Sequence, residues 1–143
     1  MSTLSPRLQA VVDALPLRPG MRVLEVGGGP GAAARAVARR VGDGHVLMIN
    51  RSDRSVALAK AHAAAEIGAG TMSVRRVAVE DFVLGPDEQP YDLAFAVRVG
   101  ALDGRHPRLG EVALRRLADA LVAPGLLLVD GGDPLRAVPL PSR

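Results

Sequence analysis

Residues 23–31 of the chain are Val-Leu-Glu-Val-Gly-Gly-Gly-Pro-Gly, and an alanine-rich stretch begins directly after them. The apolar start predicts a buried strand. The glycines predict a sharp turn, because glycine accepts positive φ and lets a ligand lie close to backbone N–H groups. The N-terminus of the following helix would add unsatisfied N–H donors and the positive end of a helix dipole. The stretch therefore predicts a nucleotide-binding turn.

Length and composition favour one domain. We expect a single domain over 1–143, with an N-terminal helix and lead-in in 1–20 and an irregular tail in 131–143. The lack of cysteine excludes disulfides and thiolate metal sites, and the histidines share no metal-ligand spacing. No apolar run approaches the roughly 20 residues of a membrane span, and the N-terminus lacks a signal-peptide pattern. We therefore expect a cytoplasmic protein with neither a metal nor a membrane partner.

The net charge of +3 raises the question of a nucleic-acid partner. The arginines, however, are spread along the whole chain rather than gathered in one segment. The aromatic residues are only Phe82, Tyr91 and Phe95, too few to predict a platform on which bases stack. We therefore expect a small-molecule substrate and no nucleic acid.

Apolar periodicity and turn residues predict the remaining elements. Ser5 and Pro6 begin an N-terminal helix that ends before Pro16. Strands are expected at 21–26, 45–50, 71–79, 91–99 and 126–130, and helices at 30–41, 52–68 and 107–122. Because strands alternate with helices, the fold class is α/β: a Rossmann-like, mostly parallel sheet of five core strands with helices on both faces. Such sheets bind ligands at the carboxyl ends of their strands, where the glycine loop falls.

Two ligand patterns fit the glycine loop. Residues 27–32 match the dinucleotide pattern Gly-x-Gly-x-x-Ala, in which a helix N-terminus receives a pyrophosphate. The second pattern is Glu-x-Gly-x-Gly-x-Gly, which Glu25 heads. A carboxylate at this position would repel a pyrophosphate but suits a cationic ligand. On charge, Glu25 therefore favours S-adenosylmethionine, which carries a sulfonium and an α-amino group.

Three segments of the chain resemble class I S-adenosylmethionine-dependent methyltransferases. Residues 18–27, Arg-Pro-Gly-Met-Arg-Val-Leu-Glu-Val-Gly, are similar to the lead-in and start of the family's first motif. Residues 91–96, Tyr-Asp-Leu-Ala-Phe-Ala, resemble its fourth strand, and residues 123–129, Ala-Pro-Gly-Leu-Leu-Leu-Val, resemble its fifth. The resemblance covers residues 18–130. It implies S-adenosylmethionine as the cofactor and methyl transfer to an unidentified small-molecule acceptor.

The resemblance implies that the glycine loop holds the methionine part of the cofactor. Glu25 would meet the amino group, directly or through water. The loop would be shaped by four cofactor-binding glycines: Gly27, Gly28, Gly29 and Gly31. The resemblance implies no catalytic residue, because the sulfonium is already activated and the protein mainly has to align the acceptor with it.

Further cofactor contacts would come from the ends of later strands. Asn50 falls at the ribose, Arg51 beside the adenine, and Val79 and Glu80 at the adenine edge. Three residues after the fourth strand would face the transferred methyl group: Arg98, Gly100 and Ala101. The family usually has an acidic residue at the ribose position. An amide lacks that charge, and losing a charge-assisted hydrogen bond weakens binding by about 1–2 kcal/mol.

Two other functions stay open. The run Asn50-Arg51-Ser52 is also typical of an NADP-binding oxidoreductase, in which a basic residue accepts the 2′-phosphate. The amide at Asn50 also fits a methyltransferase-like pseudoenzyme, a binding or assembly subunit. Only thirteen residues follow Asp130, and we expect them to lack the family's C-terminal hairpin. The fifth strand would then be an exposed edge, which predicts a homodimer or other homo-oligomer that covers it.

Two residues in the loop after the fourth strand are candidate general bases. Asp103 and His106 precede the helix expected at 107–122, near the place where an acceptor would enter. A histidine at this position more commonly caps the following helix, and we expect that role for His106. The catalytic residues therefore stay unassigned.

Overall fold

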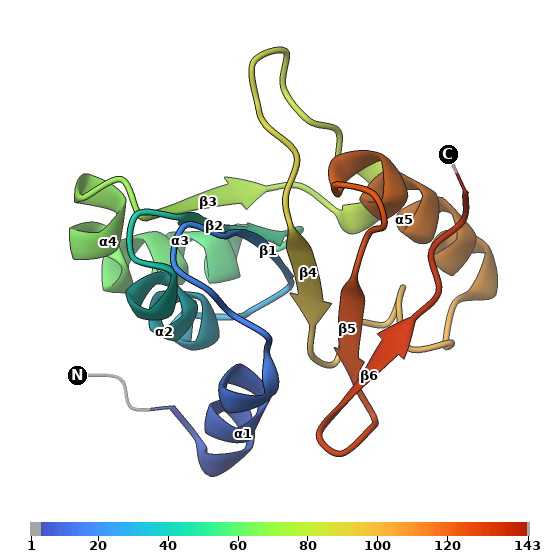
Figure 1. Cartoon of the computed structure of the whole chain (residues 1–143), viewed down its shortest axis with the longest axis horizontal. Helices are drawn as coiled ribbons and strands as arrows, with labels where there is room; N and C mark the ends of the chain where they lie inside the picture. Colours follow the sequence, from blue (N-terminus) through green and yellow to red (C-terminus); the bar gives the residue numbers. More distant parts are fainter. Residues whose placement is uncertain (1–3, 143) are drawn as a thin grey trace.

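A six-stranded sheet crosses the molecule, with its strands in the order β3-β2-β1-β4-β5-β6 (Figure 1). The structure is a computed structural model and describes residues 4–142. The strands are β1 (Arg22–Val26), β2 (His45–Asn50), β3 (Met72–Arg76), β4 (Leu93–Ala96), β5 (Leu127–Asp130) and β6 (Leu135–Val138). Neighbouring strands pair in parallel except β5 and β6, which are antiparallel. The α/β class and the mostly parallel sheet are therefore confirmed.

Helices cover both faces of this sheet. They are α1 (Pro6–Ala14), α2 (Ala32–Val41), α3 (Asp53–His62), α4 (Ala64–Gly68), the short 3-10 helix η1 (Val79–Asp81) and α5 (Pro107–Ala120). Alternate residues of a strand point to opposite faces. In β1, Val23 packs with residues of α1, α2 and α3, whereas Leu24 packs with residues of η1 and α5. The core therefore consists of two apolar layers, one on each face of the sheet.

The C-terminal residues form a strand, so the expectation of five strands, an irregular tail and no hairpin is wrong. Strand β6 pairs antiparallel with β5 over four residue pairs. The hairpin fits into so few residues because glycines reverse the chain. Gly131 has φ 105, and a Cβ on Gly132 would lie 2.2 Å from the Leu135 carbonyl oxygen. Since β6 covers the edge of β5, the reason for expecting a homodimer through that edge no longer holds.

Besides the strand expected at 91–99, which spans only Leu93–Ala96, two elements differ clearly from their expected ranges. The helix expected at 52–68 is divided at Ala63 into α3 and α4, and Ala59 and Ala63 are both fully buried. The strand expected at 71–79 ends at Arg76, and η1 follows it. Val79 of η1 belongs to the apolar layer under α5. In both places tertiary packing bends a segment whose local propensity favours one continuous element.

Candidate functional site

The glycine loop joins β1 to α2 in a conformation that requires glycine. Gly27, Gly28, Gly29 and Gly31 have φ values of 88°, 92°, 51° and 89°. This left-handed region is costly for residues that carry a Cβ. Gly31 is the N-cap of α2 and has no side chain to offer the first helical N–H groups. The first N–H groups of α2 therefore lie at the carboxyl end of β1 without a side-chain cap, whereas the Gly27 and Gly31 N–H groups donate to the Ile49 and Gly28 carbonyl oxygens.

Glu25 lies beneath this loop and is 2% exposed. A Cβ on Gly28 would lie 2.8 Å from the Glu25 Cδ atom, so the carboxyl group packs directly against the loop backbone. The Ala34 backbone N–H, in the first turn of α2, donates to the carboxylate. Oε1 has no hydrogen-bond partner among the described residues. Burial raises the pKa of Glu25 to about 8, with the Ala34 hydrogen bond opposing that rise.

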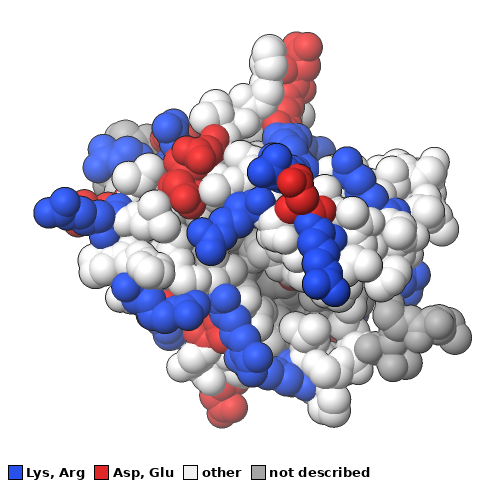
Figure 2. All heavy atoms as spheres, turned by 180° about the vertical axis from the view of Figure 1, so that it is seen from behind, with Lys and Arg blue, Asp and Glu red and all other residues white. Residues whose placement is uncertain are grey.

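A cavity of about 520 Å³ opens beside the loop, at the carboxyl ends of the central strands. It lies where the strand order reverses between β1 and β4, which is the place where open α/β sheets bind ligands. Six of the ten predicted cofactor-binding residues line it: Gly27, Asn50, Arg51, Val79, Glu80 and Arg98. The other four do not line it but form the loop or lie beneath it: Glu25, Gly28, Gly29 and Gly31. Figure 2 shows the hollowed face of the molecule, with Lys and Arg side chains gathered around the hollow.

Asn50, at the end of β2, is already engaged in the turn that leads to α3. Its Oδ1 accepts a hydrogen bond from the Ser52 backbone N–H at 2.9 Å. Ser52 in turn caps α3 by accepting from the Ser55 N–H at 3.2 Å. The NH₂ group of Asn50 therefore stays available to donate to one hydroxyl of a ribose. A single neutral donor replaces the bidentate carboxylate that the family usually has here.

Arg98, after β4, has φ 57, the only positive φ of a non-glycine residue in the described part of the chain. Its backbone N–H donates to Asp130 Oδ1 at 3.0 Å, and Asp130 Oδ2 pairs with the Arg7 guanidinium of α1 at 2.8 Å. Sequence reasoning missed Asp130. The sequence signal that could have identified Asp130 is its position as an acidic residue at the carboxyl end of an expected strand.

The loop between β4 and α5 forms the far wall of the cavity. A Cβ on Gly100 would lie 3.2 Å from both an Arg105 guanidinium nitrogen and the His106 Cδ2, so both side chains pack against this glycine. His106 occupies the N-cap position of α5, but its side chain makes no capping hydrogen bond within residues 4–142. The expected capping role is therefore wrong, and the imidazole instead lines the cavity. Asp103 accepts from Arg105 Nε at 2.8 Å, which lowers the pKa of Asp103.

The loop before β4 is held more firmly than its sequence indicates. Glu88 accepts two hydrogen bonds from Arg75, one from the Gly85 N–H and one from the Tyr91 hydroxyl. Burial opposes ionisation of Glu88, but these donors outweigh it and lower its pKa to about 2. The adjacent Asp92 accepts from the Arg22 backbone N–H at 2.9 Å and so ties the loop to β1. These contacts support the strands behind the cavity and take no part in lining it.

No group of three or more His, Asp or Glu side chains within residues 4–142 is arranged to hold a metal ion. None of the helices in that range is both long enough and apolar enough to cross a membrane.

The fold and the cavity define a Rossmann-like domain with a ligand site at its topological switch point. The sequence profile of the family described as a methyltransferase domain matches residues 23–125, well over half of the chain. The chain therefore belongs to this family of methyltransferase domains. S-adenosylmethionine is the cofactor that the family and its structural neighbours indicate. No curated protein matches the chain by sequence.

Solved structures share this fold. A SAM-dependent methyltransferase from Aquifex aeolicus is 21% identical, with 85% of this chain and 62% of that one aligned at a TM-score of 0.66. Coclaurine N-methyltransferase, bound to N-methylheliamine and SAH, is 19% identical over 90% of this chain and 37% of its own, at 0.70. The [4+2]-cyclase SpnF is 26% identical over 85% and 42%, at 0.68. The chain thus spans between 37% and 62% of the length of these proteins.

The residues around the loop fit S-adenosylmethionine. The unpartnered, buried Oε1 of Glu25 is an acceptor suited to an ammonium group. A Cβ on Gly27 would lie 3.0 Å from a Val99 methyl carbon, so glycine at this position lets the loop after β4 approach the glycine loop closely. The free NH₂ group of Asn50 fits a ribose hydroxyl. The arrangement is therefore consistent with the cofactor of the family.

Proposed function

We propose that this domain binds S-adenosylmethionine and transfers its methyl group to a small-molecule acceptor in the same cavity. The observation that carries the proposal is Glu25, a carboxyl group buried under the glycine loop with one oxygen that lacks a partner. A buried, unpaired acceptor costs about 1–3 kcal/mol, so a cationic ligand that pairs with it gains a corresponding advantage. The amino group of the cofactor is such a cation, whereas a pyrophosphate has no donor to offer this oxygen.

The chain's own residues would hold and align the ligands. Glu25 and the loop would bind the methionine part, Asn50 the ribose, and Val79 and Glu80 the adenine edge. The bound cofactor supplies a methyl group already activated by its sulfonium. What remains for the protein is to orient the acceptor and to exclude water. We assign both roles to the loop between β4 and α5, which forms the far wall of the cavity and includes Arg98.

The size of the cavity supports a small acceptor. Its volume of about 520 Å³ is within the range of about 300–1,000 Å³ typical of single ligand sites. One cavity of this size would have to take both the adenosyl group and the acceptor. The remaining space suits a metabolite better than a folded macromolecule.

Specific observations also fit two other functions, a binding or assembly subunit and an NADP-binding oxidoreductase. The neutral amide of Asn50 in place of an acid, and a chain that spans only part of its structural neighbours, are features of a binding or assembly subunit as well. Arg51 beside Asn50 would also suit NADP, although its pyrophosphate would leave Oε1 of Glu25 without a donor. A cytoplasmic location and a homo-oligomer also stay predictions. A light-scattering mass tests the oligomer, which would have to use a surface other than the covered edge of β5.

Isothermal titration calorimetry with S-adenosylmethionine, S-adenosylhomocysteine and NADPH tests the proposal. We expect submillimolar binding of the two adenosyl ligands and about a tenfold loss of affinity in Glu25→Gln, since a charge-assisted hydrogen bond is lost. Glu111→Gln, at an exposed position on α5, is the matched control and should bind as the wild type does. Tight binding of NADPH alone would refute the proposal, and binding of none of the three would favour the subunit.

The same titration has a second readout in proton release. Because burial raises the pKa of Glu25 to about 8, the carboxyl group is protonated near neutral pH before the ligand binds. An ammonium group that pairs with it favours the ionised form, so binding should release a proton. The measured heat should then differ between phosphate and Tris buffers in the wild type. It should not differ in Glu25→Gln.

A further inference from the structure

We propose that the methyl acceptor carries an anionic group, a carboxylate or a phosphate, which the Arg98 guanidinium binds at the rim of the cavity. The proposal rests on the methyl-transfer function above and names the chemical class of its acceptor. It is carried by three features of Arg98: its backbone conformation, its anchoring, and the lack of an internal partner for its charge.

The backbone of Arg98 is held in a conformation that arginine does not favour. Its φ of 57 lies in the left-handed region, which costs a residue with a Cβ about 1–2 kcal/mol. Strained residues of this kind persist where the surrounding structure holds them, and they cluster at ligand sites. A glycine would meet the backbone requirement without strain. We therefore infer that this position carries arginine for its side chain and not for its backbone conformation.

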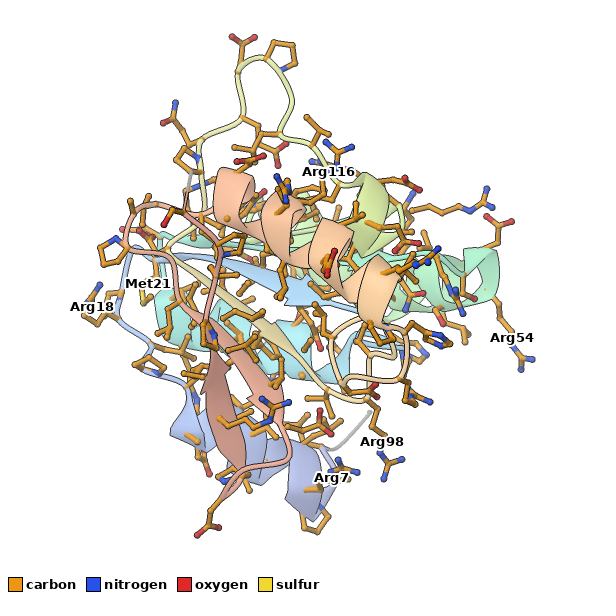
Figure 3. The ribbon with its side chains drawn as sticks, turned by 90° about the vertical axis from the view of Figure 1, so that its right-hand side faces the viewer. Arg7, Arg18, Met21, Arg54, Arg98 and Arg116 are labelled. Carbon is orange, nitrogen blue, oxygen red and sulfur yellow. The ribbon has the colours of Figure 1, made fainter. Side chains whose placement is uncertain are left out.

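Two elements anchor this strained residue. Asp130, at the end of β5, accepts the Arg98 backbone N–H at 3.0 Å, and Arg7 of α1 pairs with the same carboxylate at 2.8 Å. Arg98 and Arg7 lie near each other at one end of the sheet, while Arg54 lies well away from both (Figure 3). Asp130 thus acts as a positioning residue: it holds the backbone of Arg98, a residue that lines the cavity and is exposed to solvent.

The guanidinium of Arg98 has no hydrogen bond or ion pair to another residue within the described range 4–142. Its neighbour on the same wall, Arg105, is by contrast paired with Asp103 at 2.8 Å. The charged side chains that line the cavity are three arginines, Arg51, Arg98 and Arg105, against the single carboxylate of Glu80. This basic excess, visible around the hollow in Figure 2, attracts an anion. Arginine binds carboxylates and phosphates through paired N–H donors.

The position of Arg98 favours the acceptor over the cofactor. Arg98 belongs to the wall after β4, with Gly100, Ala101 and His106, whereas Asn50 lines the cavity from the end of β2 and Glu80 from η1. Apart from Arg98 itself, the cofactor-binding residues predicted above lie at the glycine loop, at the end of β2 and in η1. We therefore assign an anion at the rim of the β4 wall to the acceptor.

The test measures binding of aromatic probes to the whole chain saturated with S-adenosylhomocysteine. The probes are phenyl phosphate and benzoate, with neutral benzamide and cationic benzylamine as counterparts, and ligand-observed NMR at about 50 mM salt limits screening. The variants are Arg98→Met and Asp130→Ala, with Asp130→Asn as the conservative rescue because it keeps an oxygen acceptor. Arg54→Met removes an exposed arginine of α3 that does not line the cavity, and is the matched control.

We expect the two anions to bind about tenfold more tightly than benzamide, and Arg98→Met to remove that preference, as loss of one charge-assisted hydrogen bond implies. Asp130→Ala should weaken anion binding, and Asp130→Asn should restore it. Arg54→Met should have no effect, and the affinity for S-adenosylhomocysteine should stay within about twofold throughout. The ratio of phenyl phosphate to benzoate affinity distinguishes the two anionic groups.

Three results would overturn the proposal: equal binding of benzoate and benzamide, anion binding that is unchanged in Arg98→Met, or a loss of S-adenosylhomocysteine affinity in that variant. The last would assign Arg98 to the carboxylate of the cofactor. If the wild type fails to bind S-adenosylhomocysteine, the proposed methyl transfer fails instead. In that case, comparing anion binding by the wild type and by Arg98→Met without S-adenosylhomocysteine still shows whether Arg98 binds the anion.

Discussion

Replacing Glu25 by glutamine should change how the stability of the protein depends on pH. The side chain is 2% exposed, and burial raises its pKa from 4.5 to about 8. A carboxyl group whose pKa is raised by folding stabilises the folded state only while it stays protonated. Its contribution is present below the unfolded pKa of 4.5 and is lost as pH rises toward 8. Glutamine keeps the shape of the side chain and cannot ionise.

The magnitude follows from the size of the shift. One pKa unit corresponds to about 1.4 kcal/mol, so the wild type should lose about 1.4 kcal/mol of unfolding free energy per pH unit between 4.5 and 8. At pH 7 the accumulated loss is about 3 kcal/mol. That is a large share of the stability of a domain, which is typically about 5–15 kcal/mol. The unfolding free energy of Glu25→Gln should therefore rise relative to the wild type as pH increases.

Urea denaturation, followed by circular dichroism at several pH values from about 5 to 9, measures this difference. Groups that titrate in both proteins cancel in the comparison, which leaves Glu25. The control Glu111→Gln, at an exposed position, should run parallel to the wild type. A difference between Glu25→Gln and the wild type that stays constant within about 0.5 kcal/mol over this range would show that the carboxyl group is not buried as described.

Four further substitutions test the glycine loop, the cavity rim and the loop before β4. Gly28→Ala should lower the unfolding free energy by about 2–4 kcal/mol, because its Cβ would lie 2.8 Å from two side-chain atoms. Gly29→Ala meets no described atom within 4 Å and should cost about 1 kcal/mol, so equal losses in urea would contradict the steric argument. Arg98→Gly should stabilise the protein by about 0.5 kcal/mol by relieving the strain at φ 57, and a lower melting temperature in calorimetry would count against that strain. Glu88→Gln should make the unfolding free energy less sensitive to acid. Hydrogen bonds such as those from Arg75 outweigh burial and lower the pKa of Glu88 to about 2, so the wild type loses stability as pH falls from 4.5 toward 2. Parallel acid transitions of wild type and variant, followed by circular dichroism, would refute that role.

Features set by neighbouring residues were predictable. The β2 range 45–50 agrees with the structure because turn residues mark both of its ends. The glycines of residues 27–31 all adopt positive φ because the turn from β1 into α2 is decided locally. The hairpin was missed because its glycines and prolines also fit an irregular tail. Pairing of β6 with β5 depends on an edge that only the assembled sheet provides.

Contacts between distant residues were not predictable. Nothing in the loop sequence shows that Arg75 and Tyr91 converge on Glu88, since the first lies on another strand. The anchoring of Arg98 by Asp130 likewise joins the ends of β4 and β5, thirty-two positions apart along the chain. His106 follows the sequence rule for a helix cap by position, but its side chain lines the cavity instead.

The amino-acid sequence alone determined the α/β class, the strand-to-helix glycine loop and the acidic residue at its head. These depend on local periodicity and on the φ values that glycine permits. The tertiary structure decided the chemical state of that residue. Burial under the loop makes Glu25 neutral near pH 7 and leaves one oxygen without a partner among the described residues. Desolvation depends on what packs around a group, and packing is a property of the whole fold rather than of any one segment.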